Sequence, residues 1–427
     1  MGRILKILGI GLVVSLFYFS FGVTFLPPNI NTKMIIALFG MLTAVYHAIQ
    51  NRSVKISRPL LGAIGFVVLF SIICFVSSDY NHTDDLSYAT YFVSFAVWIF
   101  AAYAVCTLIK WGHGVINLTL LTFYLAGVCF TQCALALLID SIPAFQQWVN
   151  QYIDQGQDFL LEVNRLYGIG ASLDNAGVRF SIVLIMMAGI LSKEQAIRTS
   201  SWSIIVLLTG FFTIIIIGNM ISRTTSTGAG LAILYLMWNT GIVRMIIKPN
   251  FFKFHLIFGF MLILALLITT YFYQSDSIFQ GQIRFAFEGF FNWIEYGEWR
   301  TGSTDKLNNN MWVWPTDLKT WIIGTGLFDN WVFGTDIGYC RLIMYSGLVG
   351  FSVFSLFFIY NAAVFARKYR QYSHMFFLFF VLTFVVWIKV STDIFLIYAL
   401  FYCMDILRNN KTLNQQDENR LLHTRYI

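Results

Sequence analysis

Four arginines lie near glycines and small polar residues that separate apolar stretches of the chain: Arg165, Arg179, Arg223 and Arg300. Arg284 and Arg341 complete the set. A guanidinium group stays protonated and grips two phosphate oxygens at once, so this residue type suits the binding of a diphosphate. The alternative is that each arginine pairs with a nearby acid or extends its stem along apolar surface.

A second group of polar residues stands at the start of an apolar stretch, where Thr335, Asp336, Tyr339 and Arg341 follow one another closely. An ionised side chain at the centre of a membrane costs roughly 2.5–3.5 kcal/mol on insertion scales. These residues therefore either lie at a membrane boundary, where Thr335 or Asp336 caps a helix, or line a polar cavity. Arg341 can pair with Asp336 only if the helix begins at Asp336, because five residues along a helix place side chains about 140° apart.

Membrane helices must position these residues. Of the 427 residues, 58% are hydrophobic and 11% are charged, and the mean hydropathy is +0.69. About 25% of the residues of a soluble domain are charged, so the composition indicates an all-α, polytopic integral membrane protein. A spanning helix needs about 20 mostly apolar residues. On that basis the sequence predicts a single membrane domain over 1–427 with about twelve spans: 7–26, 34–50, 59–77, 88–109, 115–138, 177–192, 201–219, 226–243, 255–273, 337–364, 375–389 and 391–407.

The distribution of charge predicts the orientation of these spans. Lys and Arg concentrate in the segments on the same side as the N-terminus, such as 51–58 and 366–374, whereas Asp and Glu concentrate on the other side. The positive-inside rule then places both termini in the cytoplasm. The pI of about 9.0 follows from this topology and gives no reason to expect nucleic acid as a partner.

Two of the predicted outer segments are long, namely 139–176 and 274–336. Long connections without a fold of their own are uncommon unless they are functional or disordered. Both segments are rich in aromatic residues and contain amphipathic stretches. We therefore expect them to be ordered and to fold over the outer face of the membrane.

Several kinds of site are not expected. The six cysteines lie in or beside apolar runs without a CxxC pair, so neither a disulfide scaffold nor a zinc site is implied. The predicted outer segments hold no carboxylate cluster like the metal site of nucleotide-sugar enzymes, and the sequence predicts no metal or other cofactor. The apolar N-terminal stretch lacks a small-x-small cleavage site and is expected to be a retained helix.

Four short motifs in the second half of the chain resemble those of the O-antigen polymerase and ligase superfamily. RLYGIG at 165–170 with DNAG at 174–177 resembles the arginine loop that precedes a span in that family. ISRTTSTG at 221–228 is similar to a turn between two later spans. The remaining two are similar to its second large loop and to the start of the next helix: EWRTG at 298–302 with WIIGTG at 321–326, and TDIGY at 335–339 with YSGLVG at 345–350.

The resemblance covers roughly residues 160–350 and implies a GT-C-like membrane fold and a defined activity. Polymerases of this family join glycans carried on undecaprenyl diphosphate, outside the bacterial cytoplasmic membrane, into O-antigen or capsular polysaccharide. By this analogy Arg165, Arg223 and Arg300 bind the diphosphate and stabilise it as it leaves, without a metal. Asp336 is the candidate for deprotonating or orienting the acceptor hydroxyl, with Glu298 or Asp305 as substitutes. Substrate binding would involve Arg179, Arg284, Arg341 and Tyr339.

Two alternatives stay open. An O-antigen ligase would transfer finished glycan to another acceptor, but ligases usually carry a histidine in the last motif, where this chain has Asp336. A flippase of lipid-linked oligosaccharides would need charges inside its spans and short loops, the reverse of the pattern here. The expected partners are undecaprenyl-diphosphate-linked glycans, membrane lipid, and a chain-length regulator and flippase of the same pathway.

Overall fold

The protein is almost entirely helical. The computed structural model describes residues 2–27, 30–53, 56–156, 159–160, 165–241, 251–328 and 332–408. Within these ranges the only sheet is a short antiparallel pair, in which β1 (Gly22–Val23) lies against β2 (Ile153–Asp154). The predicted all-α class is therefore confirmed.

Eight of the described helices are long and apolar enough to cross a membrane, which confirms a polytopic membrane protein. They are α2 (Thr32–Asn51), α3 (Arg58–Tyr80), α4 (Tyr91–His113), α5 (Leu118–Ser141), α8 (Leu173–Lys193), α10 (Ser201–Ile221), α12 (Phe252–Ser275) and α17 (Gly338–Lys368). Shorter helices occupy the other predicted spans: α1 (Gly2–Tyr18), α11 (Thr225–Thr240), α18 (Ser373–Val386) and a stretch over 395–408. The first predicted span extends to residue 26, but α1 ends at Tyr18, and the chain beyond it pairs with β2 instead.

Polar residues at the ends of the apolar runs fix where several helices begin. The side chains of Asn31, Ser57, Asn117 and Ser200 each accept a hydrogen bond from the backbone N–H three residues on. Each such cap satisfies an N–H group that has no partner within the helix, and it contributes about 1 kcal/mol. The starts of α2, α3, α5 and α10 thus follow directly from local sequence.

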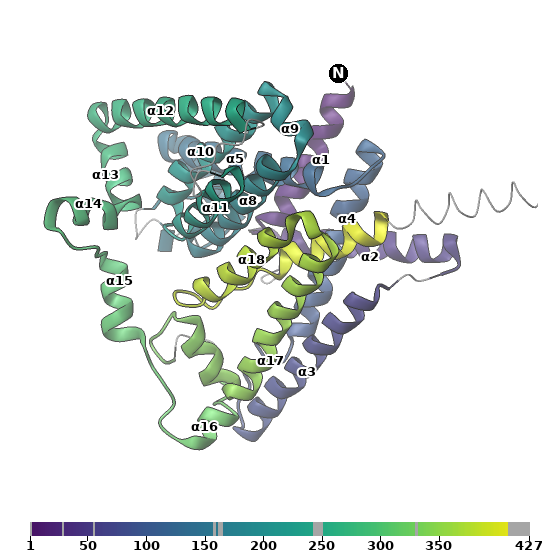
Figure 1. Cartoon of the computed structure of the whole chain (residues 1–427). Coiled ribbons are helices and arrows are strands. Elements are labelled where there is room, and N and C mark those ends of the chain that lie inside the picture. Colours follow the sequence, from purple (N-terminus) through teal and green to yellow (C-terminus); the bar gives the residue numbers. More distant parts are fainter. Residues whose placement is uncertain are drawn as a thin grey trace, which may run out of the picture.

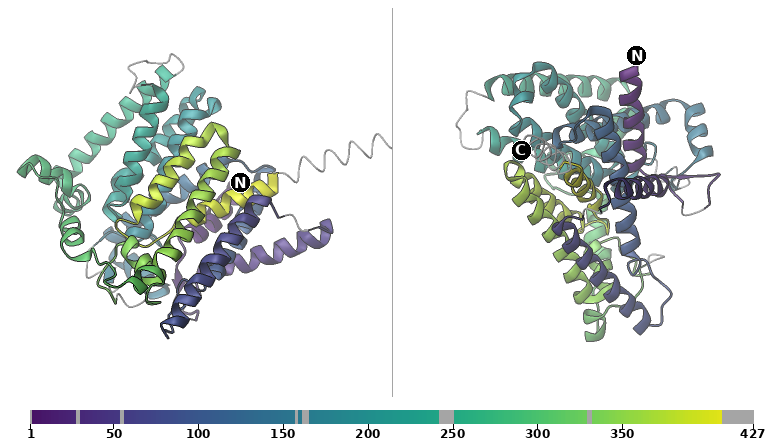
Figure 2. Two further views of the ribbon diagram at one scale, coloured as in Figure 1. Left: turned by 60° about the horizontal axis from the view of Figure 1, so that its bottom comes forward. Right: turned by 90° about the vertical axis from the view of Figure 1, so that its right-hand side faces the viewer.

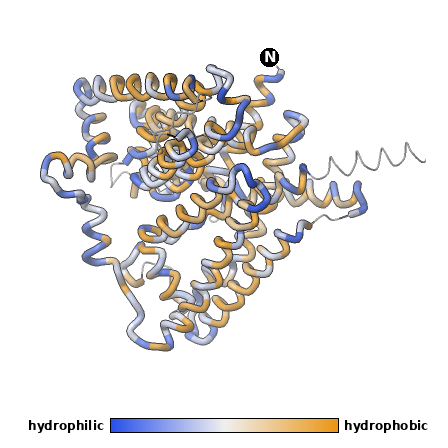
Figure 3. Tube along the Cα trace, viewed as in Figure 1, coloured by the Kyte–Doolittle hydropathy of each residue, from blue (hydrophilic) through white to orange (hydrophobic). Residues whose placement is uncertain are grey.

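Helix α8 forms the centre of the bundle and α12 its edge. In the most apolar part of α8, 89% of the residues are buried. In the most apolar part of α12, none of the residues are buried. Helix α8 packs against α5, α10, α11 and α18. Gly228 of α11 brings the backbones close, because a Cβ there would lie 2.2 Å from the Cα atom of Ser181. Helix α12 lies at the top edge of the molecule in Figure 1, and the colouring of Figure 3 shows that most of its residues are hydrophobic. That surface suits contact with lipid.

The segments between the long helices gather at two opposite ends. At one end the Asn81 amide donates to the Gly324 carbonyl, and Lys389 contacts Asp174. At the other end the Lys110 ammonium donates to the Leu407 carbonyl. Helices α3 and α17 run side by side between the two ends in every view (Figures 1 and 2).

The described part of residues 274–336 forms a series of short helices between α12 and α17 along one side of the molecule (Figure 1). They are α13 (Ser277–Ala286), α14 (Glu288–Tyr296), α15 (Gly302–Lys306), the π-helical turn η3 (Leu307–Met311) and α16 (Leu318–Ile322). Among the described residues of 139–176, α6 (Pro143–Tyr152) is a comparable short helix. Both segments are therefore ordered over most of the residues that the structure describes.

Two of the glycine motifs meet where α17 is kinked. Gly347 has φ +63° and interrupts the helix, so the carbonyls of Met344 and Tyr345 are free to accept from outside it. They accept hydrogen bonds from the N–H groups of Thr325 and Gly326, at 2.7 and 3.0 Å. The GTG turn at 324–326 is therefore bound to the kink of the helix that follows.

Candidate functional site

Two of the predicted arginines converge on one aromatic ring. Arg165 lies in the segment before α8, Arg223 lies in the turn between α10 and α11, and Phe285 lies in α13. The guanidinium carbons of Arg165 and Arg223 lie 5.0 and 4.0 Å from the centre of the Phe285 ring. Both distances are within the range of a cation–π interaction. The chain thus brings two cations from distant segments to one place.

Arg223 is only partly neutralised by its neighbours. Its Nη2 atom forms an ion pair with Glu288 at 2.5 Å, and its Nη1 atom donates to the Ser303 hydroxyl at 3.3 Å. Its Nε atom is buried without a hydrogen-bond partner. Burial lowers the pKa of Arg223, Glu288 opposes this change, and the nearby charge of Arg165 lowers it further. The surroundings of Arg223 are therefore electropositive, and its Nε–H group remains available as a hydrogen-bond donor.

Arg165 has no carboxylate partner among the described residues. Within that part of the chain, no hydrogen bond or ion pair engages its guanidinium group, and its ring contact is with Phe285. Two neighbouring guanidinium groups that retain unused N–H donors form a ready site for an anion with several oxygens. A diphosphate has the required charge and the required number of acceptors.

A carboxylate on α8 holds the turn that carries Arg223. The Oδ1 atom of Asp174 accepts hydrogen bonds from the Ser222 hydroxyl at 3.2 Å, the Thr224 hydroxyl at 2.6 Å and the Lys389 ammonium at 2.7 Å. Gly177 permits this approach, because a Cβ there would lie 2.5 Å from the Ser222 hydroxyl oxygen. Asp174 and Lys389 therefore position Arg223 through its neighbours.

The sequence interpretation missed Lys389. It stands at the end of a predicted span, where a basic residue suggests only a membrane boundary. The signal that distinguishes it is the run of polar residues 391–393, which begins two residues after it. Thr392 in that run donates to the side chain of Asn175 at 3.0 Å, which fixes the segment against α8.

Arg179 lies further along α8, and its neighbours differ from those of Arg165 and Arg223. Its guanidinium carbon is 5.6 Å from the centre of the Phe19 ring. Asp393, which accepts from the Tyr91 hydroxyl at 3.1 Å, is among the charges that act on Arg179. Arg179 thus belongs to a second polar cluster beside α8, and no described contact joins it to Arg165 or Arg223.

Arg284 and Arg300 form exposed ion pairs within the second long segment. Arg284 donates to both carboxylate oxygens of Glu295, at 2.7 and 2.8 Å. The side chain of Arg300 is 60% exposed and pairs with Glu298 and Asp305, both at 3.1 Å. Neither arginine contacts Arg165 or Arg223 in the described structure. Their roles in catalysis and substrate binding stay predictions.

Asp336 lies exposed just before α17. The residue before it, Thr335, is buried, and its hydroxyl accepts a hydrogen bond from the N–H of Ile337 at 3.1 Å and donates to the carbonyl of Met311 at 2.5 Å. Thr335 therefore fixes the chain at the start of α17 and leaves Asp336 at the surface. No described contact joins Asp336 to the arginine pair.

Tyr339 and Arg341 point into the protein. The Tyr339 hydroxyl donates to the Phe384 carbonyl at 2.9 Å. Arg341 donates to the Phe328 carbonyl at 2.7 Å and to the Ser391 hydroxyl at 3.3 Å. Because α17 begins at Gly338 rather than Asp336, the geometry required for an Asp336–Arg341 pair is not present, and Arg341 has the separate partners just described.

The described residues contain no group of three or more His, Cys, Asp or Glu side chains arranged to hold a metal ion. What the site offers is cationic: the Arg165–Arg223 pair around Phe285, with Lys389 behind it. Comparison of the chain with protein-family models, curated proteins and solved structures gives no match.

Proposed function

We propose that the chain is a membrane glycosyltransferase, a polymerase that joins oligosaccharide repeat units carried on undecaprenyl diphosphate into O-antigen or capsular polysaccharide. The observation that carries this proposal is the Arg165–Arg223 pair, in which Arg165 has no described anionic partner. Preorganised cations aimed at developing negative charge commonly contribute more to catalysis than any other effect. The departing lipid diphosphate develops such charge, and the two guanidinium groups would receive it.

The proposed reaction needs no nucleotide, because the diphosphate already activates the donor sugar. The acceptor hydroxyl displaces the diphosphate, the new glycosidic bond forms at the sugar carbon, and the hydroxyl proton passes to a base. Asp336, exposed at the start of α17, is the proposed base. Direct displacement of this kind inverts the configuration at the anomeric carbon.

We further propose twelve membrane crossings with both termini in the cytoplasm of a bacterial cell. Contacts between connecting segments support this arrangement, because segments assigned to the same side contact one another. Lys6 donates to the Trp111 carbonyl on the predicted inner side, and Arg223 pairs with Glu288 on the predicted outer side. The two long segments then cover the outer end of the bundle.

The deciding experiment incubates purified protein with an undecaprenyl-diphosphate-linked repeat unit in the absence of nucleotide and divalent metal. The expected product is a ladder of longer lipid-linked glycans together with free undecaprenyl diphosphate. Arg165→Ala and Arg223→Ala should each reduce the rate about 100-fold or more, as the removal of one charge-stabilising donor does elsewhere. Arg367→Ala, an exposed arginine at the opposite end, is the matched control and should retain the wild-type rate.

Three other results would overturn the polymerase. Single transfer to a different acceptor, with release of diphosphate, would indicate a ligase. Transbilayer movement of the same lipid in liposomes, without any product, would indicate a flippase. A ladder that persists in both arginine variants would show polymerisation without the proposed site.

A further inference from the structure

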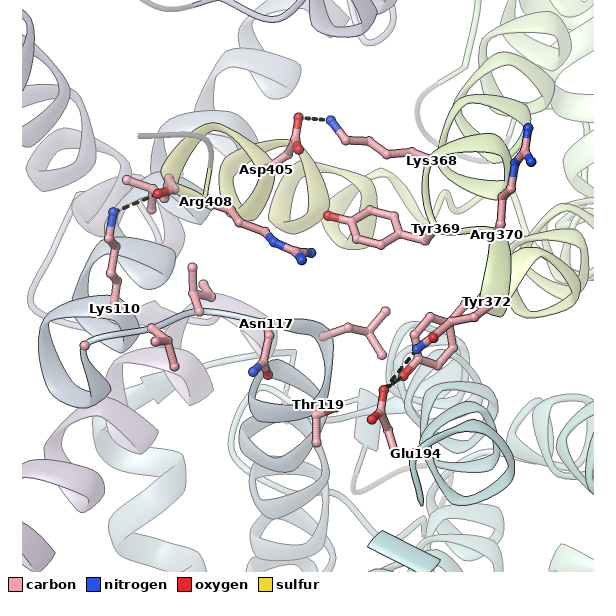
Figure 4. Close-up of a pocket in the computed structure, with 16 residues that line it drawn as sticks. Lys110, Asn117, Thr119, Glu194, Lys368, Tyr369, Arg370, Tyr372, Asp405 and Arg408 are labelled. Atoms are coloured by element: carbon pink, nitrogen blue, oxygen red, sulfur yellow. Dashed lines mark hydrogen bonds and ion pairs between the residues drawn. The ribbon is translucent and has the colours of Figure 1, made fainter. Parts of the chain in front are cut away.

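A large polar cavity lies at the end of the bundle opposite the arginine pair. Its volume is about 920 Å³, and five elements contribute to it: the end of α4, the start of α5, the junction after α8, the turn η5 (Arg370–Tyr372) after α17, and the stretch 395–408. Figure 4 shows its lining. Ligand sites commonly have volumes of this order.

Most charged groups in this cavity already have partners. The Lys110 ammonium donates to the Leu407 carbonyl at 2.7 Å, and Lys368 forms an ion pair with Asp405. The carboxylate of Glu194 accepts from the Tyr372 hydroxyl and from the Gln371 amide. These pairs keep both carboxylates of the lining occupied.

Two donors, Arg408 and Tyr369, have side chains that point into the cavity (Figure 4) and have no such partner among the described residues. Within the described residues, no hydrogen bond or ion pair engages the Arg408 guanidinium, and Figure 4 shows its side chain reaching into the cavity. The Tyr369 hydroxyl is buried and has no hydrogen-bond partner. Burial raises the pKa of Tyr369, so its hydroxyl remains a donor at neutral pH. A buried donor without a partner costs free energy comparable to a lost hydrogen bond.

The first turn of α5 adds the positive end of a helix. Asn117, Leu118 and Thr119 line the cavity, and α5 is 24 residues long. The N-terminal end of such a helix favours an anion. A tetrahedral anion could therefore accept from Arg408, from Tyr369 and at the start of α5.

We infer that this cavity binds a phosphate group, with Arg408 and Tyr369 as its principal donors. The phosphate belongs either to the headgroup of an anionic lipid or to a soluble phosphorylated compound, since both present the same oxygens. This site is independent of the proposed polymerase activity, because it lies at the other end of the bundle and shares no residue with the arginine pair.

The test uses full-length protein carrying Arg165→Ala and Arg223→Ala, so that the other cationic site makes no contribution. Its unfolding temperature is measured with inorganic phosphate in detergent and, separately, in nanodiscs of phosphatidylglycerol or phosphatidylcholine. We expect one phosphate source to raise the unfolding temperature by about 2 °C. Arg408→Gln should weaken binding of that source about tenfold, and Tyr369→Phe should weaken it by a smaller factor.

Arg367→Gln is the matched control, since Arg367 is exposed and lies two residues before Tyr369 without lining the cavity. A response to inorganic phosphate identifies a soluble ligand, and a response to phosphatidylglycerol alone identifies a lipid headgroup. The inference fails if neither source stabilises the protein, or if Arg408→Gln and Arg367→Gln have equal effects. The test measures only the unfolding temperature, so its outcome does not depend on whether the protein is a polymerase.

Discussion

Arg165 and Arg223 are held together although like charges repel each other. The Phe285 ring offers its negative face to both guanidinium groups, and Glu288 neutralises part of the charge on Arg223. Glu288 also binds the loop beyond it, because its Oε1 atom accepts from the N–H of Gly302 at 3.0 Å. This carboxylate therefore both stabilises the pair and competes with any anion for Arg223.

Glu288→Gln should strengthen the binding of pyrophosphate at this site about tenfold, because a neutral amide competes less for the Arg223 guanidinium. The measurement is calorimetric titration in an Arg408→Gln background, which removes the second proposed site. Glu295→Gln is the control, since Glu295 pairs with Arg284 and does not contact Arg223. Unchanged or weaker binding in Glu288→Gln would show that the carboxylate does not compete.

At the scale of elements, α16 and the turn after it are fixed to the kink in α17. Gly347 approaches the backbone of Ile322 so closely that a Cβ would lie 2.1 Å from its carbonyl oxygen. The start of α16 is set by Asp317, whose carboxylate accepts from the N–H and the hydroxyl of Thr320 at 2.9 and 2.7 Å. The position of α16, near the end of the second long segment, thus depends on Gly347 and on the cap formed by Asp317.

Gly347→Ala should destabilise the protein by about 2 kcal/mol or more, because its positive φ is strained for alanine and the added Cβ collides with fixed backbone. Thermal unfolding in detergent measures the effect. Gly65→Ala is the control, since Gly65 lies inside α3 with no atom near its Cβ position. This control should be neutral or slightly stabilising, because alanine favours helix more than glycine does.

The Asp317 cap predicts a dependence of stability on pH. Hydrogen bonds from the Thr320 hydroxyl and N–H hold the pKa of Asp317 below its ordinary value. A carboxyl group with a lowered pKa in the folded state contributes stability above its unfolded pKa and loses it as the pH falls through the folded value. The difference in unfolding temperature between wild type and Asp317→Ala should therefore be constant from about pH 5 to 8 and shrink below about pH 4. A difference that does not change with pH would contradict this cap.

At the scale of the molecule, the connecting segments divide into two sets at opposite ends of the bundle. The Arg165–Arg223 pair lies at one end, and the cavity lined by Tyr369 and Arg408 lies at the other. The six native cysteines are all buried, so single cysteines introduced at the surface can report on each end separately.

A cysteine at Lys306 and a cysteine at Arg367 should react with a membrane-impermeant maleimide from opposite sides of the membrane. In spheroplasts we expect labelling of Lys306→Cys alone, and Arg367→Cys should become reactive only after the membrane is permeabilised. Both positions are exposed. The native protein is the control and should not label. Reaction of both variants from one side would overturn the proposed topology.

Hydropathy predicts the long helices well, because each apolar run must satisfy its backbone in lipid by forming a helix. It places α3, α5 and α10 within a few residues of their observed bounds. It cannot show that Arg165 and Arg223 meet at Phe285, since three separate segments form that contact. Lys389 was missed for the same reason: its partner Asp174 lies far away along the chain. Local charge and spacing carry no information about which segments meet.

The length of α12 has a consequence for the site at its end. Its 24 residues span about 36 Å at about 1.5 Å per residue, and a helix longer than a hydrocarbon layer of about 30 Å is accommodated by tilting, by kinking or by local thickening of the bilayer. It packs mainly against α10 and α13, and α13 carries Phe285 between the two arginines. A thinner bilayer increases this mismatch, and a change in the tilt of α12 would displace α13 and its ring. We therefore expect the acyl chain length of the surrounding lipid to influence the spacing of the two cations.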